Sequence, residues 1–319
     1  MLKTNHVVYF YCNHIENDKE LHIRRICRKD HTENVERIVN KQPTIMRCIS
    51  INNKHPYLKL GPFNFDIQNN DPIRLVIHNF LSEQEISLIR KRYLKYLTFE
   101  RSAPVLAYVS TAVSYGSQKA STFRFNDLFY NTSNIRNTDT TVNIFAEVTR
   151  TRKNMMYNIA KRIELSTRIN VIEYGSAYPY RLQLNGLGSL IESHNDFYSV
   201  LNKSKTLHRE FEYKRKYGDN MASMIIWLND IEGGGGTYFS SIGRSQVITP
   251  VKGAALFWIN LKSSGYSCPY SEHGGCPVSK GMKLVLGQWI NHYNQWQNFP
   301  CRTKADLKIN LSIGGTSLI

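Results

Sequence analysis

The sequence predicts an α+β protein whose core is a double-stranded β-helix (jelly roll), with helices packed on one face and an N-terminal extension. Three observations lead to this expectation. The first 56 residues are polar and weakly periodic, helical patterns occur between residues 82 and 165, and short apolar segments with Gly-containing turns follow residue 170. Helices followed by many short strands are typical of a sandwich or barrel that is covered by helices on one side.

These changes of pattern divide the chain into three parts. Residues 1–56 are predicted to be an N-terminal extension, rich in His and Asn, with one short helix around Glu33–Val39. Residues 57–301 form the predicted main domain, whose β-rich core spans about 171–293, and residues 302–319 form a C-terminal tail. A chain of 319 residues is long enough to bury a substantial core.

The main domain begins with a predicted strand, Arg74–His78, and a capped helix. Ser82-Glu83-Gln84-Glu85 is a capping box, in which the Ser and the second Glu satisfy each other's backbone N–H groups. Residues 107–138, rich in Ser, Thr, Asn and Tyr, are predicted to be a loop or an edge hairpin. The capped helix has apolar residues at helical spacing, namely Ile86, Ile89, Tyr93 and Leu97.

A longer helix is predicted from about Thr141 to Leu165, and we expect Met155 and Met156 to pack in the core rather than to bind a cofactor. Its apolar side carries Val142, Phe145, Val148, Met155, Ile159 and Ile163. Gly233–Gly236 is predicted to form a tight turn among the strands that follow. Those strands are predicted at Arg181–Leu184, Ile191–His194, Met224–Leu228, Thr237–Phe239, Gln246–Thr249, Ala254–Ile259 and Lys283–Ile290.

The composition favours a folded, basic protein, with 41% hydrophobic residues and a formal net charge of +16. There is no run of five Lys or Arg residues and no helix-turn-helix or zinc-knuckle pattern, so a nucleic-acid partner is not predicted. No span approaches the ~18 apolar residues of a membrane helix. The N-terminal apolar run, Val7–Tyr11, is shorter than a signal-peptide core of ~7–15 residues, so no export signal is visible.

One short motif points to a metal site. His194 and Asp196 are two residues apart, so on a strand both side chains leave the same face. With His273 they would complete two imidazoles and one carboxylate, the ligand set of non-haem Fe(II) oxygenases. The pair is not specific by itself, because the same spacing occurs at His14/Glu16, His31/Glu33 and His208/Glu210.

Further motifs follow His194 in a defined order. Together they resemble the catalytic domain of the collagen prolyl 4-hydroxylase α subunit, an Fe(II)/2-oxoglutarate dioxygenase. The resemblance covers roughly residues 25 to 301, and it is specific because several motifs recur in order with similar spacing. The motifs are Asn229-Asp230-Ile231-Glu232-Gly233-Gly234-Gly235-Gly236-Thr237-Tyr238-Phe239, Pro250-Val251-Lys252-Gly253-Ala254-Ala255-Leu256-Phe257-Trp258-Ile259-Asn260-Leu261, His273-Gly274-Gly275-Cys276-Pro277-Val278, Gly281-Met282-Lys283 and Gln288-Trp289-Ile290.

The resemblance implies a role for four residues. It assigns iron binding to His194, Asp196 and His273, and the distal carboxylate of 2-oxoglutarate to Lys283. A turn between two strands could bring Lys283 and His273 into one pocket, and a Lys suits a terminal carboxylate. The implied activity is 4-hydroxylation of proline in collagen-like X-Pro-Gly peptides with Fe(II), 2-oxoglutarate and O2, supported by L-ascorbate.

The resemblance also implies cysteine pairing and location. It pairs Cys276 with Cys301 and Cys27 with Cys48, and leaves Cys12 and Cys268 unassigned. It implies the oxidising lumen of the endoplasmic reticulum, although no signal peptide is visible. The family's N-terminal assembly region and separate peptide-binding domain have no counterpart in the sequence, so a disulfide-isomerase partner is not implied.

The chain departs from the family pattern near the predicted site. Ile191 stands where the family usually has Tyr, Ser193 replaces a Pro, and Glu272 replaces an Arg. These departures keep two alternatives open: a related dioxygenase that acts on another side chain or a nucleobase, and a catalytically weakened peptide-binding module. A proline-rich peptide in polyproline II form suits an aromatic groove, for which candidate walls are Tyr178, Tyr180, Tyr198 and the loop around Tyr108–Phe123.

Overall fold

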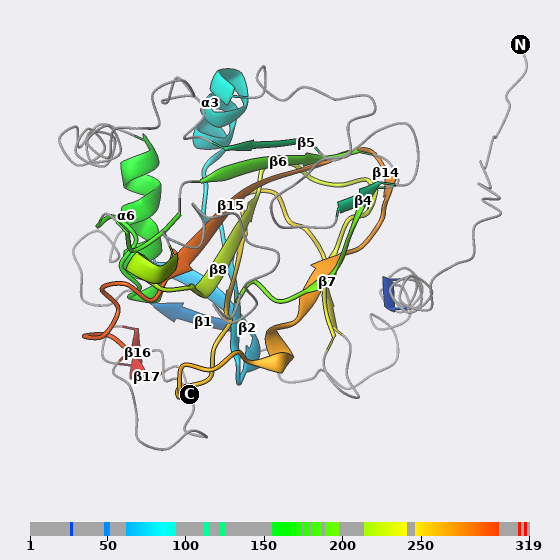
Figure 1. The fold of residues 1–319 in the computed structure, drawn as a ribbon. Coiled ribbons are helices and arrows are strands. Elements are labelled where there is room, and N and C mark those ends of the chain that lie inside the picture. The colour runs from blue at the N-terminus through cyan, green and yellow to red at the C-terminus, as the bar shows by residue number, and fades with distance from the viewer. Residues whose placement is uncertain are drawn as a thin grey trace, which may run out of the picture.

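The computed structural model describes residues 26–27, 48–51, 62–93, 112–114, 121–124, 155–173, 175–178, 180–186, 189–197, 214–240, 246–299, 312–313 and 316–317. These residues form mostly antiparallel sheets with few helices (Figure 1). No helix among them is long and apolar enough to cross a membrane.

The larger sheet has eight strands in the order β1-β2-β3-β12-β8-β15-β6-β5. Each neighbouring pair in it is antiparallel. Its strands are β1 (Cys48–Ile51), β2 (Phe63–Asn70), β3 (Ile73–His78), β5 (Ser121–Arg124), β6 (Arg181–Asn185), β8 (Asn220–Trp227), β12 (Ala255–Ile259) and β15 (Lys283–Asn291).

The smaller sheet has five strands in the order β11-β10-β13-β7-β4, again all antiparallel. Its strands are β4 (Ala112–Ser114), β7 (Ser189–His194), β10 (Thr237–Phe239), β11 (Gln246–Ile248) and β13 (His273–Gly275). Two short pairs complete the described strands: β9 (Gly233–Gly234) with β14 (Val278–Lys280), and β16 (Ser312–Ile313) with β17 (Thr316–Ser317).

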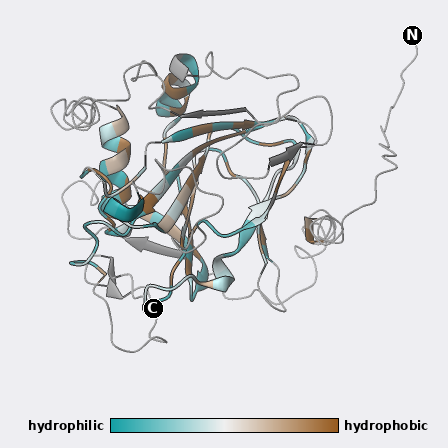
Figure 2. Cartoon of the chain, viewed as in Figure 1, coloured by the Kyte–Doolittle hydropathy of each residue, from teal (hydrophilic) through white to brown (hydrophobic). Residues whose placement is uncertain are grey.

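Alternating side chains give the larger sheet two different faces. On β12, Ala255, Phe257 and Ile259 belong to the main core cluster, whereas Leu256 and Trp258 belong to a second cluster on the other face. This is the two-residue period of a strand that is buried on both sides. Figure 2 shows the same alternation as hydrophilic and hydrophobic bands along β6.

Two helices cover the main-core face of the larger sheet, on the side away from β7 (Figure 1). They are α3 (Glu83–Tyr93) and α6 (Met155–Thr167). The second cluster lies on the opposite face and contains Phe239 and Ile248 of the smaller sheet. The faces of the two sheets therefore meet around this second cluster, whereas the buried apolar residues of the helices belong to the main cluster.

The predicted capping box is confirmed. The Glu85 carboxylate accepts a hydrogen bond from the Ser82 backbone N–H at 2.9 Å, and the Ser82 hydroxyl accepts one from the Glu85 N–H at 3.3 Å. Arg162 of α6 also donates to both Glu85 oxygens, so the same carboxylate joins the two helices. The predicted positions Ile86 and Ile89 are buried, whereas Leu97 lies outside the described residues.

The seven predicted strands are confirmed with small changes at their ends. Helix α6 accounts for the end of the predicted long helix, and residues 141–154 lie outside the described part, as does the predicted helix at Glu33–Val39. The hairpin alternative for residues 107–138 is wrong where the chain is described, because β4 pairs with β7 and β5 with β6 in a different sheet. β1 lies within residues 1–56 and pairs with β2.

The cysteine pairing implied by the resemblance is wrong. Cys27 forms a disulfide with Cys276, and the two are 249 residues apart in the sequence. Cys48 starts β1 at the edge of the larger sheet, whereas Cys27 packs with Cys276 and Tyr238 beside the smaller sheet. Cys48, the next cysteine along the chain, therefore lies in the larger sheet, whereas the Cys27–Cys276 disulfide lies beside the smaller one. Cys268 is a buried free thiol, and Cys12 and Cys301 lie outside the described residues.

Candidate active site

Adjacent strands of the smaller sheet bring the two predicted imidazoles together. His194 on β7 is directly opposite His273 on β13, and their ring centroids are 4.5 Å apart. The register then shifts, so that Ile191 is opposite Gly275. The interval from His194 to Ile191 on β7 is three residues, whereas the matching interval from His273 to Gly275 on β13 is two. This β-bulge lets Ile191 and His194 line the same pocket although they are three residues apart.

The bulge depends on a glycine at its centre. A Cβ atom on Gly274 would lie 2.3 Å from the Tyr238 hydroxyl and 2.6 Å from the carbonyl oxygen of Ile191. The Tyr238 hydroxyl itself donates to that carbonyl at 3.4 Å. The motif His273-Gly274-Gly275 therefore has a steric reason for the glycine that follows the imidazole.

Asp196 is not on the same strand as His194, although its two-residue spacing from His194 suggested a shared strand. β7 ends at His194, and Asp196 lies in a bend beyond the strand, so the argument from a shared strand face is wrong. The two side chains nevertheless converge: Nε2 of His194 lies 3.6 Å from Oδ1 of Asp196. Nε2 of His273 lies 3.5 Å from Oδ2 of the same carboxylate.

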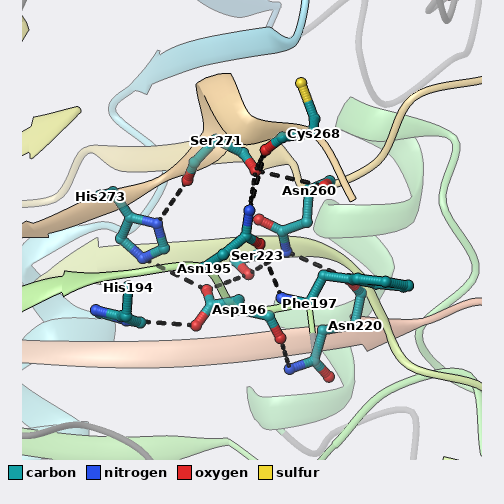
Figure 3. A network of polar contacts seen from close by, with 10 residues as sticks. All are labelled: His194, Asn195, Asp196, Phe197, Asn220, Ser223, Asn260, Cys268, Ser271 and His273. Carbon is teal, nitrogen blue, oxygen red and sulfur yellow. Dashed lines mark hydrogen bonds and ion pairs between the residues drawn. The ribbon is translucent and has the colours of Figure 1, made fainter. Parts of the chain in front are cut away.

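The three donor groups fit a divalent metal ion. One ligand atom from each of His194, Asp196 and His273 can be chosen so that all lie within 4.8 Å of one another (Figure 3). Nδ1 of His273 faces the Ser271 carbonyl oxygen at 2.8 Å, which leaves the Nε2 lone pair directed at the site. Oδ1 of Asp196 is buried and accepts no hydrogen bond from the described residues. A metal ion would satisfy that oxygen.

The electrostatics keep these groups in the state that a metal needs. Burial lowers the pKa of His273 to about 4, although Asp196 acts in the opposite direction. Burial alone would raise the pKa of Asp196, but His273, His194 and a hydrogen bond from Ser223 outweigh it, so this pKa lies well below its usual range. Neutral imidazole and ionised carboxylate are the ligand forms that bind metal.

Lys283 lies in the same pocket as the three donors. Its side chain is on the face of β15 that also carries Val285, Gly287 and Trp289, all of which line the pocket. Burial lowers the pKa of Lys283 to about 8, and no described residue forms an ion pair or hydrogen bond with its ammonium group. Gly235 lies beside this side chain, since a Cβ there would be in ordinary van der Waals contact with Cδ of Lys283 at 3.6 Å.

Thr237 is a pocket residue that the sequence analysis missed. It lies on β10, its side chain lines the pocket, and its buried hydroxyl has no hydrogen-bond partner among the described residues. A hydroxyl and an ammonium group in one pocket are suited to a carboxylate. The sequence signal for Thr237 was its place directly after Gly233–Gly236, within a motif that carries the family resemblance.

The pocket opens between the two sheets and has about 670 Å³ of empty space, part of it open solvent. Its described aromatic walls are Trp258 and Trp289, not the tyrosines named above. Tyr180 instead packs against the main core, and Tyr198 lies outside the described residues. The lining residues are Arg181, Gln183, Asn185, Ile191, His194, Asp196, Ser223, Met224, Ile225, Thr237, Trp258, His273, Gly274, Gly275, Lys283, Val285, Gly287 and Trp289.

Two of the departures from the family pattern are partners of each other. The Ser193 hydroxyl donates a hydrogen bond to the Glu272 carboxylate at 2.7 Å, and neither side chain lines the pocket. Ile191 is different, because it does line the pocket and lies close to Gly275. Of the three departures, only Ile191 changes the chemistry of the pocket wall.

A comparison with family models finds a match to the part of the chain that carries this arrangement. The model of the 2OG-Fe(II) oxygenase superfamily matches residues 180–291, which include all four predicted site residues. Residues 180–291 are therefore similar to 2OG-Fe(II) oxygenase domains. Members of that superfamily use Fe(II) and 2-oxoglutarate, and the grouped donors His194, Asp196 and His273 are compatible with that chemistry.

A comparison with curated proteins finds similarity over most of the chain. The chain is 28% identical to prolyl 4-hydroxylase subunit alpha-3 of Rattus norvegicus over 283 residues, covering 87% of this chain and 45% of that protein. It is 26% identical to prolyl 4-hydroxylase subunit alpha-2 of Caenorhabditis elegans over 268 residues, covering 83% and 42%. The chain thus spans less than half the length of these relatives.

Solved structures similar to the chain include the 2OG complex of the viral collagen prolyl hydroxylase vCPH from Paramecium Bursaria Chlorella virus-1. It has a TM-score of 0.38 and 16% identity, and covers 68% of this chain and 94% of that one. A second is a Trichoplax adhaerens prolyl hydroxylase in complex with a hypoxia inducible factor peptide fragment. It has a TM-score of 0.40 and 11% identity, and covers 68% and 83%.

Proposed function

We propose that the chain is an Fe(II)- and 2-oxoglutarate-dependent dioxygenase that hydroxylates proline in a peptide. One observation carries this proposal: a buried ammonium group, Lys283, shares a pocket with two imidazoles and a carboxylate that converge within ligand distance of one another. A pocket with a metal-type donor set and a separate cation suits a metal-bound, dicarboxylic co-substrate. The similarity to prolyl 4-hydroxylase α subunits supports proline as the target.

The proposal gives each residue a role. His194, Asp196 and His273 hold Fe(II), and Lys283, helped by the Thr237 hydroxyl, binds the distal carboxylate of 2-oxoglutarate. When bound, Fe(II) with 2-oxoglutarate and dioxygen supplies the oxidising chemistry that hydroxylates the substrate and releases succinate and carbon dioxide. The same four residues, His194, Asp196, His273 and Lys283, are the proposed catalytic group.

The chain's own contribution is orientation and exclusion of water. Ser223 donates a 2.6 Å hydrogen bond to Oδ2 of Asp196 and so fixes the rotation of that carboxylate. Trp258 packs edge-on to the His273 ring, with centroids 4.6 Å apart, and limits its movement. These contacts hold the donors in one geometry before any ligand binds, which lowers the cost of forming the site.

The finer fold and the domain limits belong to the same proposal. Two antiparallel sheets that meet around a shared pocket support a double-stranded β-helix core within about residues 171–293. We place the dioxygenase domain at residues 57–301, with the extension at 1–56 and the tail at 302–319. The β1–β2 pair and the Cys27–Cys276 disulfide attach parts of the extension to the domain.

The proposed substrate is a proline-rich or collagen-like peptide, with L-ascorbate keeping the iron in its active state. Trp289 lies under the guanidinium group of Arg181, 4.7 Å from its ring centroid, and both line the pocket beside the donor set. An aromatic wall of this kind suits the apolar ring of proline. The Cys27–Cys276 disulfide favours an oxidising compartment, in line with the lumen of the endoplasmic reticulum.

Succinate release tests the function directly. The chain is incubated with Fe(II), ascorbate and 2-oxoglutarate, and with either a (Pro-Pro-Gly)-type peptide, the same peptide with Ala in place of Pro, or a methylated oligonucleotide. We expect succinate and hydroxyproline only with the proline peptide. Turnover with the oligonucleotide alone would overturn the proposed substrate class. Tight peptide binding without any succinate would overturn the enzymatic proposal and leave a binding module.

A further inference from the structure

Asp196 lies beyond the end of β7, so no strand ladder holds it in place. Side chains hold it instead: Nδ2 of Asn220 donates to the Asp196 carbonyl oxygen at 2.9 Å, Ser223 donates to its carboxylate, and the neighbouring Asn195 adds further contacts. The adjacent residue, Asn195, is not among the residues that line the pocket. Its side chain instead makes contacts with two segments of the chain (Figure 3). These contacts identify a positioning role that the function proposed above does not include.

On the near side, Asn195 closes the turn around Asp196. Its side-chain Oδ1 accepts a hydrogen bond from the Phe197 backbone N–H at 2.9 Å, which spans Asp196. Such an Asx turn replaces the backbone bonding that the chain loses when the strand ends. The Asn195 side chain therefore holds the main chain on both sides of Asp196.

On the far side, Asn195 reaches the loop that leads into His273. Its Nδ2 donates to the Cys268 carbonyl oxygen and to the Ser271 hydroxyl, each at 3.0 Å. The Ser271 hydroxyl in turn donates to the Cys268 carbonyl oxygen at 2.6 Å. The Asn195 amide thus makes three hydrogen bonds out of the four that an amide side chain can make.

Ser271 connects these contacts to the second imidazole. The carbonyl oxygen of Ser271 faces Nδ1 of His273 at 2.8 Å and sets the orientation of that ring. Contacts from Asn195 through Ser271 to His273 therefore join two ligand-bearing segments. Asn195 and Ser271 themselves are 76 positions apart in the sequence. Ser271 itself is fully buried, so its hydroxyl is not exposed to bulk solvent.

We propose that Asn195 and Ser271 form a clamp that sets the distance between the Asp196 carboxylate and the His273 imidazole. The inference rests on the proposed function, because it concerns the residues assigned to the metal. Partners that orient metal ligands in this way typically change metal affinity by about 10–100-fold when they are removed. The clamp acts through Asp196 and His273 and touches neither the metal nor the substrate.

The test measures metal binding rather than turnover. Co(II) is titrated calorimetrically into the metal-free chain, and the visible absorption of the Co(II) complex and the unfolding temperature of the metal-free chain are recorded. The variants are Asn195→Ala, Ser271→Ala and their combination. Asn195→Ser keeps a short acceptor for the Phe197 N–H but does not reach Cys268, so it breaks the clamp and keeps the turn.

Asn170→Ala is the matched control. Asn170 is also a half-buried amide whose Nδ2 donates to a backbone carbonyl, that of Asn294, but it has no contact with the donor set. We expect Asn195→Ala, Asn195→Ser and Ser271→Ala to weaken Co(II) binding by about 10-fold or more and to change the absorption bands. The double variant should weaken Co(II) binding little more than either single variant, because both substitutions remove the same contact between Asn195 and Ser271. Asn170→Ala should lower only the unfolding temperature.

The outcomes separate the clamp from the metal site. Unchanged Co(II) affinity and absorption in Asn195→Ser and Ser271→Ala, with a wild-type chain that does bind Co(II), would overturn the clamp alone. A wild-type chain that binds no Co(II), or a His273→Ala variant that binds as tightly as wild type, would overturn the metal site and the clamp with it. If Asn195→Ala does not fold, the Ser variant and Ser271→Ala decide.

Discussion

His194 and His273 are direct partners across two antiparallel strands, with ring centroids 4.5 Å apart, although 79 positions separate them in the sequence (273 − 194). The pairing of β7 with β13 makes this contact, and the bulge beside it turns His194 towards the pocket. The backbone ladder holds the two imidazoles, so their relative position is expected to survive loss of the metal.

His194→Ala is expected to abolish metal binding and succinate formation, because two donors of the proposed set cannot retain the ion against solvent. Calorimetric titration with Co(II) and the succinate assay measure the two effects. His78→Ala is the control, since His78 lies on β3 and does not line the pocket. Unchanged turnover in His194→Ala would remove this residue from the site.

Lys283→Ala is expected to raise the dissociation constant of 2-oxoglutarate by about 30-fold or more, since loss of one partner of a buried charged pair costs about 2 kcal/mol or more. Metal binding should be retained, because Lys283 is not among the grouped donors. Lys280→Ala is the matched control, with a lysine that is exposed and paired with Glu232. Equal 2-oxoglutarate affinity in the two variants would contradict the assigned role.

The affinity for 2-oxoglutarate should fall as the pH rises through about 8. Burial lowers the pKa of Lys283 from 10.5 to about 8, so the ammonium group of the ligand-free protein loses its proton in that range. Between these two values the unfolded chain binds more protons than the folded one, so the contribution of Lys283 to folding stability rises with pH there. Calorimetric titrations of 2-oxoglutarate at pH 7 and pH 9 measure the affinity change, which should be absent in Lys283→Met.

Gly274→Ala is expected to destabilise the protein by about 3 kcal/mol and to weaken metal binding, because the new Cβ overlaps the Tyr238 hydroxyl and the Ile191 carbonyl oxygen. The strands that carry the two imidazoles must separate to admit it. Gly265→Ala is the control: it has a positive φ of 81° but open space around the new Cβ, so it should cost about 1–2 kcal/mol and leave metal affinity unchanged. Thermal unfolding and Co(II) titration distinguish the two.

Proteolysis under non-reducing conditions should release one fragment that contains both Cys27 and Cys276. Mass spectrometry before and after reduction identifies it. A linked Cys27–Cys48 or Cys276–Cys301 fragment in its place would restore the pairing that the family resemblance implied. Cys268 should react with a thiol reagent only after unfolding, because it is buried.

The sequence supported many of the local features of this fold. The capping box at Ser82–Glu85 and the strand patterns could be predicted because they depend on contacts within a few residues. The disulfide and the route of Asp196 into the site could not, since both depend on which segments meet in space. The same holds for the hydrogen bond between Ser193 and Glu272. In the sequence these two residues are only two separate departures from the family pattern.

The sequence by itself determined the residue types of the site: their order along the chain, with the spacing of the glycines, was enough to point to His194, Asp196, His273 and Lys283. The tertiary structure alone decided how they meet. The bulge in β7, the turn that Asn195 closes and the two-residue period of β15 bring groups from three segments into one pocket. These are long-range contacts, whose partners no local pattern of residues specifies.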